Sequence, residues 1–290
     1  MSQDLLLGDV GGSGSRWALL SNDALTWSAG DLPGANPATG SMDDLGQALQ
    51  ERSPVMGSPG LVMVYGAGCG TRKRGERVRM LLGKVFKEAD IVVADDLLGA
   101  ARALFGDRGG HALILGTGMN AGHFDGRKID HRIRSIGYIL GDEGSGADIG
   151  RCLFRDALRG DMPRHVEEAL FGGDGLDPSA VVETIHRSAS TAMALAGPVK
   201  HLGQVREDPY VHQLLRERFG AMALQVGREL GAGTFRAVGS VAWAFASELR
   251  DAFQEHGSML DTVVRDPMDG LIAYHRTHPM SPPNSAAPQD

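Results

Sequence analysis

The sequence predicts an α/β protein built from two similar lobes, with a ligand held in the cleft between them. Two glycine-rich turns carry this prediction, because each follows an aliphatic run: residues 5–10 precede the turn at 11–15, and residues 112–115 precede the turn at 116–120. Each turn is followed by another apolar segment and not by a helix. This favours a β-hairpin and argues against the dinucleotide-binding and Walker motifs. Since the pattern occurs twice, we expect two related halves that each present a phosphate-binding turn.

The first lobe, residues 1–110, is predicted to be a mixed sheet covered by helices. Three strands come first as a meander, and helices and strands then alternate, which is typical of layered α/β structure. Apolar periodicity and turn residues place the strands at 5–10, 16–20, 25–29, 60–66 and 91–94, and the helices at 42–50, 72–87 and 97–104.

The second lobe, residues 111–266, repeats the hairpin and carries more helix. Helices are predicted at 145–159, 180–188, 190–201, 208–231 and 241–256, and a strand at 235–238. Apolar residues recur at helical spacing in the longest helix, which predicts a core stripe of Val211, Leu215, Phe219, Met222, Val226 and Leu230. Residues 267–278 are predicted to form a helix that returns to the first lobe, and the proline- and serine-rich residues 279–290 a disordered tail.

Composition favours a protein that binds a small molecule. The formal net charge of −7 leaves no basic footprint for nucleic acid or an anionic membrane, and no apolar stretch is long enough to span a bilayer. The two cysteines, Cys69 and Cys152, are too few for a disulfide scaffold, a four-cysteine zinc site or an iron–sulfur cluster. We therefore expect a cytoplasmic protein with neither nucleic-acid nor membrane partners. Its oligomeric state is open, a homodimer being one alternative.

Acidic residues near the turns are the candidates for chemistry. Asp9 ends the first strand, where its carboxylate can hold the waters of a Mg²⁺, although it also suits a plain turn. Asp95 and Asp96 stand at a strand-to-helix junction, so one is expected to cap the helix while the other faces the cleft. Asp142 and Glu143 stand among four glycines at a helix start. Acids there either cap the helix or approach a ligand closely.

Seven short segments follow one another along residues 4–276: Asp9-Val-Gly-Gly-Ser-Gly-Ser, Tyr65-Gly-Ala-Gly-Cys, Asp96-Leu-Leu-Gly-Ala-Ala, Leu115-Gly-Thr-Gly-Met-Asn, Gly137-Tyr-Ile-Leu-Gly-Asp-Glu-Gly-Ser-Gly, Val238-Gly-Ser-Val-Ala and Pro267-Met-Asp-Gly-Leu. Together they resemble the BadF/BadG/BcrA/BcrD group of the actin-like ATPase superfamily, and within it the N-acetylglucosamine kinase type. The resemblance implies the duplicated ribonuclease-H-like fold of actin, Hsp70 and hexokinase, with ATP and sugar in the cleft between the lobes.

The resemblance also implies a reaction, the ATP-dependent phosphorylation of an amino sugar, most of all N-acetylglucosamine at its 6-hydroxyl. Asp96, which matches the family's Asp-x-x-Gly motif, would accept the proton of the sugar hydroxyl, and Asp9 would organise a hydrated Mg²⁺. The sugar would contact Asn36, Gly137 and Asp142, with Glu143 left as a helix cap. ATP would contact Gly11, Gly12, Ser13, Ser15, Gly116, Thr117, Gly118, Asn120, Gly239 and Ser240.

Three positions weaken individual assignments. Without the resemblance, Asn36 reads as an ordinary loop residue before a proline. Gly14 stands where relatives often have a basic residue, and Met119 replaces the usual serine, so each removes a phosphate partner. Losing one charged hydrogen bond would lower nucleotide affinity by roughly one to two orders of magnitude, which Arg16 could offset.

Two other functions stay open from the sequence. One is an ATPase that activates a reductase or dehydratase, which would need cluster-ligating cysteines that Cys69 and Cys152 do not supply as a pair. The other is a non-catalytic sensor of sugar or nucleotide, against which the acids at Asp9, Asp96 and Asp142 argue. Among amino sugars, the sequence does not separate N-acetylglucosamine from glucosamine or N-acetylmuramate.

Overall fold

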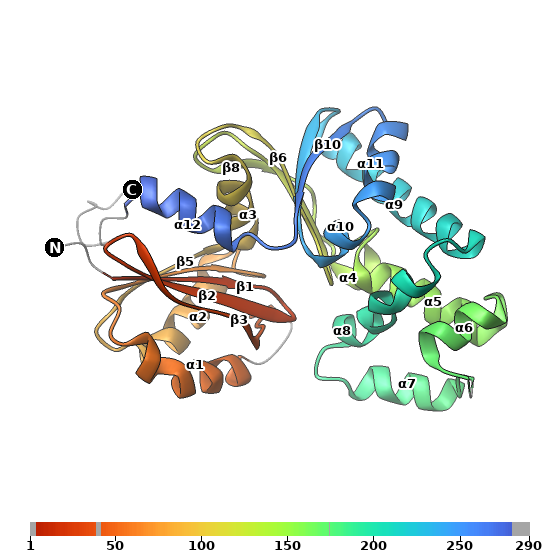
Figure 1. Cartoon of the computed structure of the whole chain (residues 1–290), viewed down its shortest axis with the longest axis horizontal. Helices are drawn as coiled ribbons and strands as arrows, with labels where there is room; N and C mark the ends of the chain where they lie inside the picture. The colour runs from red at the N-terminus through yellow and green to blue at the C-terminus, as the bar shows by residue number, and fades with distance from the viewer. Residues whose placement is uncertain (1–3, 39–41, 174, 280–290) are drawn as a thin grey trace. The chain divides into compact units, whose positions relative to one another are not determined.

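The structure, a computed structural model, describes residues 4–38, 42–173 and 175–279. The chain divides into two compact units, which we call unit 1 (residues up to 108 together with those from 267 onward) and unit 2 (residues 109–266). The last segment of the chain thus belongs to the same unit as the first (Figure 1). The predicted tail at 279–290 lies outside the described residues, apart from residue 279.

Unit 1 contains a five-stranded sheet in the order β3-β2-β1-β4-β5. Its strands are β1 (Leu5–Val10), β2 (Gly14–Ser21), β3 (Ala24–Pro33), β4 (Leu61–Gly66) and β5 (Asp90–Asp95). The first three form an antiparallel meander, and β4 and β5 run parallel to β1. The meander and the following alternation of helix and strand confirm the predicted mixed sheet.

Helices cover both faces of this sheet, because its central strands are apolar on both sides. Helices α1 (Asp43–Met56) and α2 (Arg72–Val85) pack on one face, and α3 (Asp96–Phe105) and α12 (Met268–Thr277) on the other (Figure 1). Consecutive residues of β1 divide between the two cores, since Leu6 faces α1 and α2 while Leu7 faces α12. Helix α12 approaches α3 closely, because a Cβ built at Gly270 would lie 2.4 Å from the Ala103 carbonyl oxygen.

Unit 2 repeats this sheet. Its strands are β6 (Gly110–Leu115), β7 (Met119–Phe124), β8 (Ile129–Arg132), β9 (Thr234–Val238) and β10 (Met259–Val264), in the order β10-β9-β6-β7-β8. When β6 is matched to β1 and the others follow in sequence, the spatial order is the same as in unit 1. Here too the first three strands are antiparallel and the last two parallel to the first. The duplication predicted from the two glycine turns is therefore confirmed.

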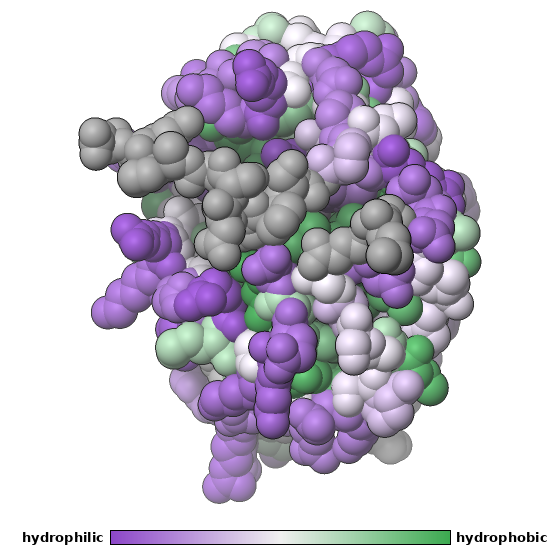
Figure 2. Space-filling view, turned by 90° about the vertical axis from the view of Figure 1, so that its left-hand side faces the viewer, coloured by the Kyte–Doolittle hydropathy of each residue, from purple (hydrophilic) through white to green (hydrophobic). Residues whose placement is uncertain are grey.

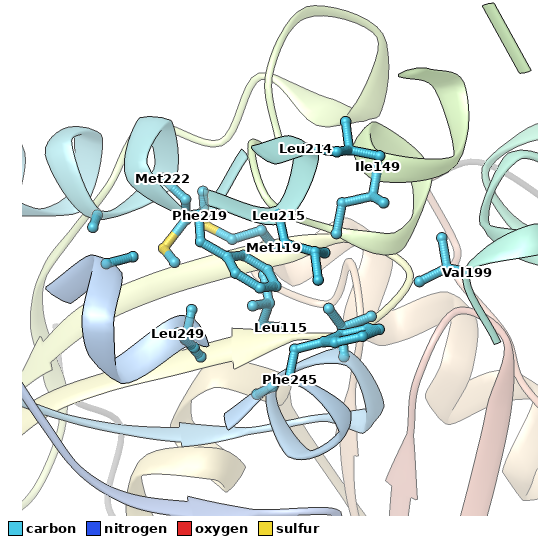
Figure 3. Packing of buried hydrophobic residues seen from close by; sticks show 14 of the residues in the cluster. Leu115, Met119, Ile149, Val199, Leu214, Leu215, Phe219, Met222, Phe245 and Leu249 are labelled. Carbon is cyan, nitrogen blue, oxygen red and sulfur yellow. The ribbon is translucent and has the colours of Figure 1, made fainter. Parts of the chain in front are cut away.

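The helices of unit 2 lie mainly between β8 and β9. They are α4 (Gly137–Leu140), α5 (Gly146–Arg159), α6 (Arg164–Phe171), α7 (Pro178–Arg187), α8 (Thr191–Ala196), the 3₁₀ helix η1 (Gly197–Val205) and α9 (Pro209–Leu230), followed after β9 by α10 (Ser240–Ala244) and α11 (Ala246–Glu255). The core stripe predicted on α9 is confirmed, with Leu230 only partly buried. Figure 3 shows Phe219 of this stripe pointing toward Leu115 of β6, beside Leu249 and Phe245.

The structure corrects several element boundaries. The helix predicted at 190–201 is two elements, because Pro198 follows Gly197 and an α-helix tolerates proline only in its first turn. The helix predicted at 241–256 is interrupted at Phe245, whose side chain is only 3% exposed and packs in the core. Strands β8 and β10 and helices α4 and α6 were not predicted.

Within the described residues, we find no helix with the length and apolar character needed to cross a membrane. The part of the unit 1 surface visible in Figure 2 carries mostly hydrophilic side chains with smaller apolar areas between them.

Candidate active site

Unit 1 gathers its candidate residues at the carboxyl ends of three parallel strands. In the register, Val10 of β1 pairs with Gly66 of β4, and Gly66 pairs with Asp95 of β5. Strand ends that lie in one row bring the following loops together, which is where open α/β sheets bind ligands. This row carries the first glycine turn, the loop at residues 66–69 and the acids that begin α3.

The first glycine turn is closed by its own backbone and supported by the segment after β3. The Gly11 N–H donates to the Gly14 carbonyl at 3.0 Å, and the Ala35 N–H donates to the Gly11 carbonyl at 3.0 Å. A Cβ built at Gly34 would lie 2.4 Å from the Gly14 nitrogen, so a side chain there would displace the turn. At Gly12 nothing lies within 4 Å of such a Cβ, which leaves space at the tip of the turn.

The Ser15 hydroxyl is directed into unit 1 and not toward a ligand. It is 1% exposed, donates to the Pro33 carbonyl at 2.8 Å and accepts from the Trp17 Nε1 at 3.0 Å. The phosphate contact expected from this hydroxyl therefore gives way to a structural role, because its one donor hydrogen goes to Pro33 and a phosphate oxygen needs a donor. Ser13, one residue beyond the turn tip, is exposed.

Asp9 precedes this turn and faces Arg16 across the hairpin. Its Oδ2 lies 4.0 Å from the Arg16 Nη1, and its side chain is 17% exposed. Among the described residues no three or more His, Cys, Asp or Glu side chains are grouped to hold a metal ion directly. A single carboxylate such as that of Asp9 can hold a Mg²⁺ through the waters of the ion.

Both acids at the start of α3 accept the same main-chain N–H. The Leu97 N–H lies 3.0 Å from the Asp95 Oδ1 and 2.8 Å from the Asp96 Oδ1, and Asp95 is the N-cap residue. The prediction that one of the two acids caps the helix is thus confirmed for Asp95. Burial, together with the nearby charges of Asp96 and Asp95, raises the pKa of the Cys69 thiol to about 12. The 66–69 loop therefore lies beside the start of α3.

Asn36 packs against the same loop. A Cβ built at Gly68, whose φ is +72°, would lie 2.1 Å from the Asn36 Oδ1. That oxygen accepts the Ala38 N–H at 2.9 Å, as a loop asparagine commonly does. Only glycine at position 68 allows this approach, so unit 1 holds Asn36 next to the loop that adjoins Asp95 and Asp96.

In unit 2 the second glycine turn is held by the start of α5. The Gly116 N–H donates to the Gly118 carbonyl at 3.0 Å, closing the turn. The first N–H groups of α5 then donate to the turn, from Gly146 to the Gly116 carbonyl at 2.8 Å and from Ala147 to the Thr117 carbonyl at 3.0 Å. The turn carbonyls therefore point toward the helix. A Cβ built at Gly116 meets nothing closer than 4.0 Å.

Asp142 joins the 137–144 loop to this turn. Its Oδ2 would lie 3.1 Å from a Cβ built at Gly118, and its carboxylate accepts the Met119 N–H. Its own φ is +59°, a left-handed conformation that Asp tolerates better than most residues. The pKa of Asp142 is raised to about 6. Burial is the main cause, the charges of Glu143 and Asp148 act in the same direction, and the Met119 hydrogen bond acts against them.

The expected helix cap at Glu143 is wrong, because the N-cap of α5 is Ser145. The Ser145 Oγ accepts the Asp148 N–H at 3.2 Å, and the Asp148 Oδ2 accepts the Gly144 N–H at 3.0 Å. Asp148 is 1% exposed and also accepts from the Arg151 Nη2 at 2.7 Å. One oxygen of Glu143, Oε2, is buried without a hydrogen-bond partner among the described residues.

Sequence reasoning missed Asp148 as the residue that holds the Asp142 loop in place. The signal was present, since Ser145-Gly-Ala-Asp148 has the Ser-x-x-Asp spacing of a capping box. Gly137 begins α4 with φ +75° and nothing within 4 Å of its Cβ position.

The end of β9 reaches the second glycine turn from the other side. Gly239 has φ +134°, and a Cβ there would lie 2.2 Å from the Leu115 carbonyl oxygen, so only glycine fits. The Ser240 Oγ lies 4.0 Å from the Cβ position of Gly116. Unit 2 thus brings together the predicted ATP residues at 116–120 and 239–240 with Asp142.

Two units that share one strand order, each with a glycine turn between its first two strands, define the two-lobed α/β fold of actin-like ATPases and sugar kinases. The chain is 33% identical to a solved structure from Porphyromonas gingivalis named "Putative N-acetylglucosamine Kinase", over 94% of this chain and 99% of that one, with a TM-score of 0.84. The chain belongs to the family of that protein.

More distant structures share the fold alone. A protein of Chromobacterium violaceum with the same printed name is 21% identical, over 94% of this chain and 99% of that one, with a TM-score of 0.65. A ROK family glucokinase of Streptomyces griseus, solved with glucose and AMPPNP, is 14% identical over 93% and 97%, with a TM-score of 0.57. No protein-family model and no curated protein matches the chain, so the narrower BadF/BadG/BcrA/BcrD assignment stays a prediction.

Proposed function

We propose that this protein transfers the γ-phosphoryl group of ATP to an amino sugar, with N-acetylglucosamine and its 6-hydroxyl as first choice. The observation that carries the proposal is the row of strand ends in unit 1, where the Asp9 turn, the Asn36 contact and the Asp95-Asp96 pair stand on adjacent parallel strands and their loops. The relationship to the Porphyromonas protein supports the same activity.

Asp96 is the proposed catalytic residue. Its carboxylate would accept the proton of the sugar hydroxyl while the hydroxyl oxygen forms a bond to the γ-phosphorus. The bond from that phosphorus to the oxygen bridging to the β-phosphate breaks, and ADP leaves. Asp95 is the N-cap residue of α3, whereas Asp96 matches the family's Asp-x-x-Gly motif, so Asp96 is the one proposed to contact the substrate.

The two glycine turns are the proposed phosphate sites. Open space around the Cβ positions of Gly12 and Gly116 leaves room for phosphate oxygens beside main-chain N–H groups. Gly11, Ser13, Thr117, Gly118 and Asn120 complete the two turns, and Gly239 with Ser240 would lie along the adenosine. A Mg²⁺ held through water by Asp9 would neutralise charge on the phosphates. Ser15 would contribute only by supporting the first turn.

Asn36 and Asp142 are the proposed side-chain contacts of the sugar hydroxyls, together with the backbone at Gly137. Since Asp142 accepts the Met119 N–H of the second turn, the residues that bind the sugar would be hydrogen-bonded to the residues that bind the phosphates.

An assay of ATP consumption over a panel of sugars tests the proposal. We expect turnover that depends on an amino sugar, with the highest kcat/KM for N-acetylglucosamine over glucosamine, N-acetylmuramate and glucose. A sensor would bind without turnover, and an activating ATPase would consume ATP without any sugar; either result would overturn the proposal. The cysteines do not favour the activator, because both are buried and burial raises both thiol pKa values.

A further inference from the structure

Trp243 is an exposed aromatic side chain next to the proposed adenosine site. It lies in α10, which begins directly after Gly239, and its main-chain N–H donates to the Gly239 carbonyl at 2.9 Å. Its side chain is 55% exposed, and its indole makes no hydrogen bond or ring contact with the described residues. Trp17 shows the contrasting case, since it is 0% exposed and its Nε1 donates to the Ser15 Oγ.

Trp243 shares a face of α10 with Ser240, the residue of this helix that lies near the second glycine turn. Residues three apart in a helix share a face, so Trp243 lies on the side of Ser240. The Ser240 Oγ is 4.0 Å from the Cβ position of Gly116. The two residues between them, Val241 and Ala242, are 7% and 0% exposed and belong to the core of unit 2.

An indole in this position suits a flat aromatic ligand group. Tryptophan has the largest aromatic surface, and stacking with a nucleobase is stable in water and tolerant of the base involved. The glycine turn offers main-chain groups to phosphates but nothing that could recognise a base. The base of a nucleotide extends from its phosphates by the length of a ribose, so its contact must come from a neighbouring element such as α10.

We propose that Trp243 stacks on the base of the nucleotide whose phosphates the second glycine turn holds. The proposal rests on the proposed function in assuming a nucleotide at this turn, and it adds the residue that selects the base. Trp243 would contribute to nucleotide affinity and to the preference for a purine, because a larger ring system stacks over more area.

Direct binding measurements on the full chain test this. ADP should quench tryptophan emission, and Trp243→Phe should lose the quenching while its ADP affinity falls only about two- to threefold. Trp243→Ala should raise the Kd for ADP roughly tenfold or more, and the Kd for UDP by less, so that the purine preference narrows. Trp27→Phe is the control, since Trp27 lies in β3 of unit 1 and should leave both the quenching and the affinity unchanged.

The outcomes separate this proposal from the one it rests on. If the wild-type chain binds ADP and Trp243→Ala binds it equally well, or loses ADP and UDP to the same extent, the stacking role is wrong while the kinase proposal stands. Emission that responds to protein concentration and not to ADP would also contradict it, because the indole would then cover a protein contact. If the wild type binds no nucleotide at all, both proposals fail.

Discussion

The Asp142 carboxylate accepts the main-chain N–H of Met119, so a single side chain ties the glycine-rich 137–144 loop to the second phosphate turn. The contact is close, because the Asp142 Oδ2 would lie 3.1 Å from a Cβ at Gly118. Any change at Asp142 should therefore affect the turn as well as the loop.

The raised pKa of Asp142 predicts a pH-dependent stability effect. Its pKa rises from 3.8 to about 6 on folding, so its contribution to stability is complete below about pH 4 and is lost as the pH rises through about 6. Asp142→Asn cannot ionise and avoids this loss. Between about pH 4 and pH 7.5 the unfolding free energy of the variant should shift in its favour by about 2 kcal/mol relative to wild type, with allowance for partial solvent contact.

Urea unfolding of both proteins at the two pH values measures this shift. Asp125→Asn serves as the control, because hydrogen bonds from the Lys128 and Arg127 main chain lower the pKa of Asp125, so its effect should have the opposite sign. A pH-independent difference between Asp142→Asn and wild type would show that the carboxyl is not perturbed in this way.

Removing Asp9 should weaken the use of Mg²⁺. In Asp9→Ala the metal loses its only proposed protein anchor, which acts through water, so the Mg²⁺ concentration for half-maximal turnover should rise. Asp44→Ala, at an exposed acid in the first turn of α1, should leave the titration unchanged. An unaltered Mg²⁺ titration in Asp9→Ala would reduce Asp9 to a turn residue paired with Arg16.

The contact between Gly68 and Asn36 predicts a selective effect on the sugar. In Gly68→Ala the new methyl group would collide with the Asn36 Oδ1, so Asn36 must move and the KM for the sugar should rise about five- to tenfold. Gly160→Ala is a matched control, since Gly160 has φ +75° but nothing within 4 Å of its Cβ position. It should lose stability by about 1–2 kcal/mol and keep its KM. A KM for the sugar that is no higher in Gly68→Ala than in Gly160→Ala would argue against a sugar contact by Asn36.

The sequence allowed the repeat and the two turns to be predicted, because aliphatic runs and glycines are local signals. It did not reveal β8, whose residues after Ile129 are all exposed, since an edge strand without a buried face has no apolar alternation. The structural role of Ser15 could not be predicted either. Its hydroxyl donates to the Pro33 carbonyl, which lies 18 residues away in the sequence, and accepts from the Trp17 indole.

At the candidate site, the residue types could be predicted but not all their partners. The capping role of Asp95 follows from its position directly before a helix. The hydrogen bond from the Gly144 N–H to Asp148 crosses the start of α5, and the Ser-x-x-Asp spacing is compatible with it but does not require it. The pairing of Gly68 with Asn36 joins two loops distant in sequence, and no local pattern encodes it.

Asp142 links the proposed sugar contacts to the second phosphate turn, so each ligand should favour the binding of the other. Calorimetric titration of a nonhydrolysable ATP analogue with and without N-acetylglucosamine should give a coupling of about 1–3 kcal/mol, and the reverse titration must give the same factor. Independent affinities for the two ligands would contradict this link between the sugar contacts and the turn.

The central claim is that Asp96 enables phosphoryl transfer from ATP to an amino sugar, and analysis of the product tests it most directly. Wild-type protein, Asp96→Asn and Asp95→Asn would be incubated with ATP, Mg²⁺ and N-acetylglucosamine, and the products followed by ³¹P and ¹H NMR. We predict one phosphate ester at the 6-position, formed in step with ADP. The rate should fall roughly 100-fold or more in Asp96→Asn and change little in Asp95→Asn, where asparagine still caps α3. ADP without a phosphosugar, or equal rates in Asp96→Asn and wild type, would contradict the account.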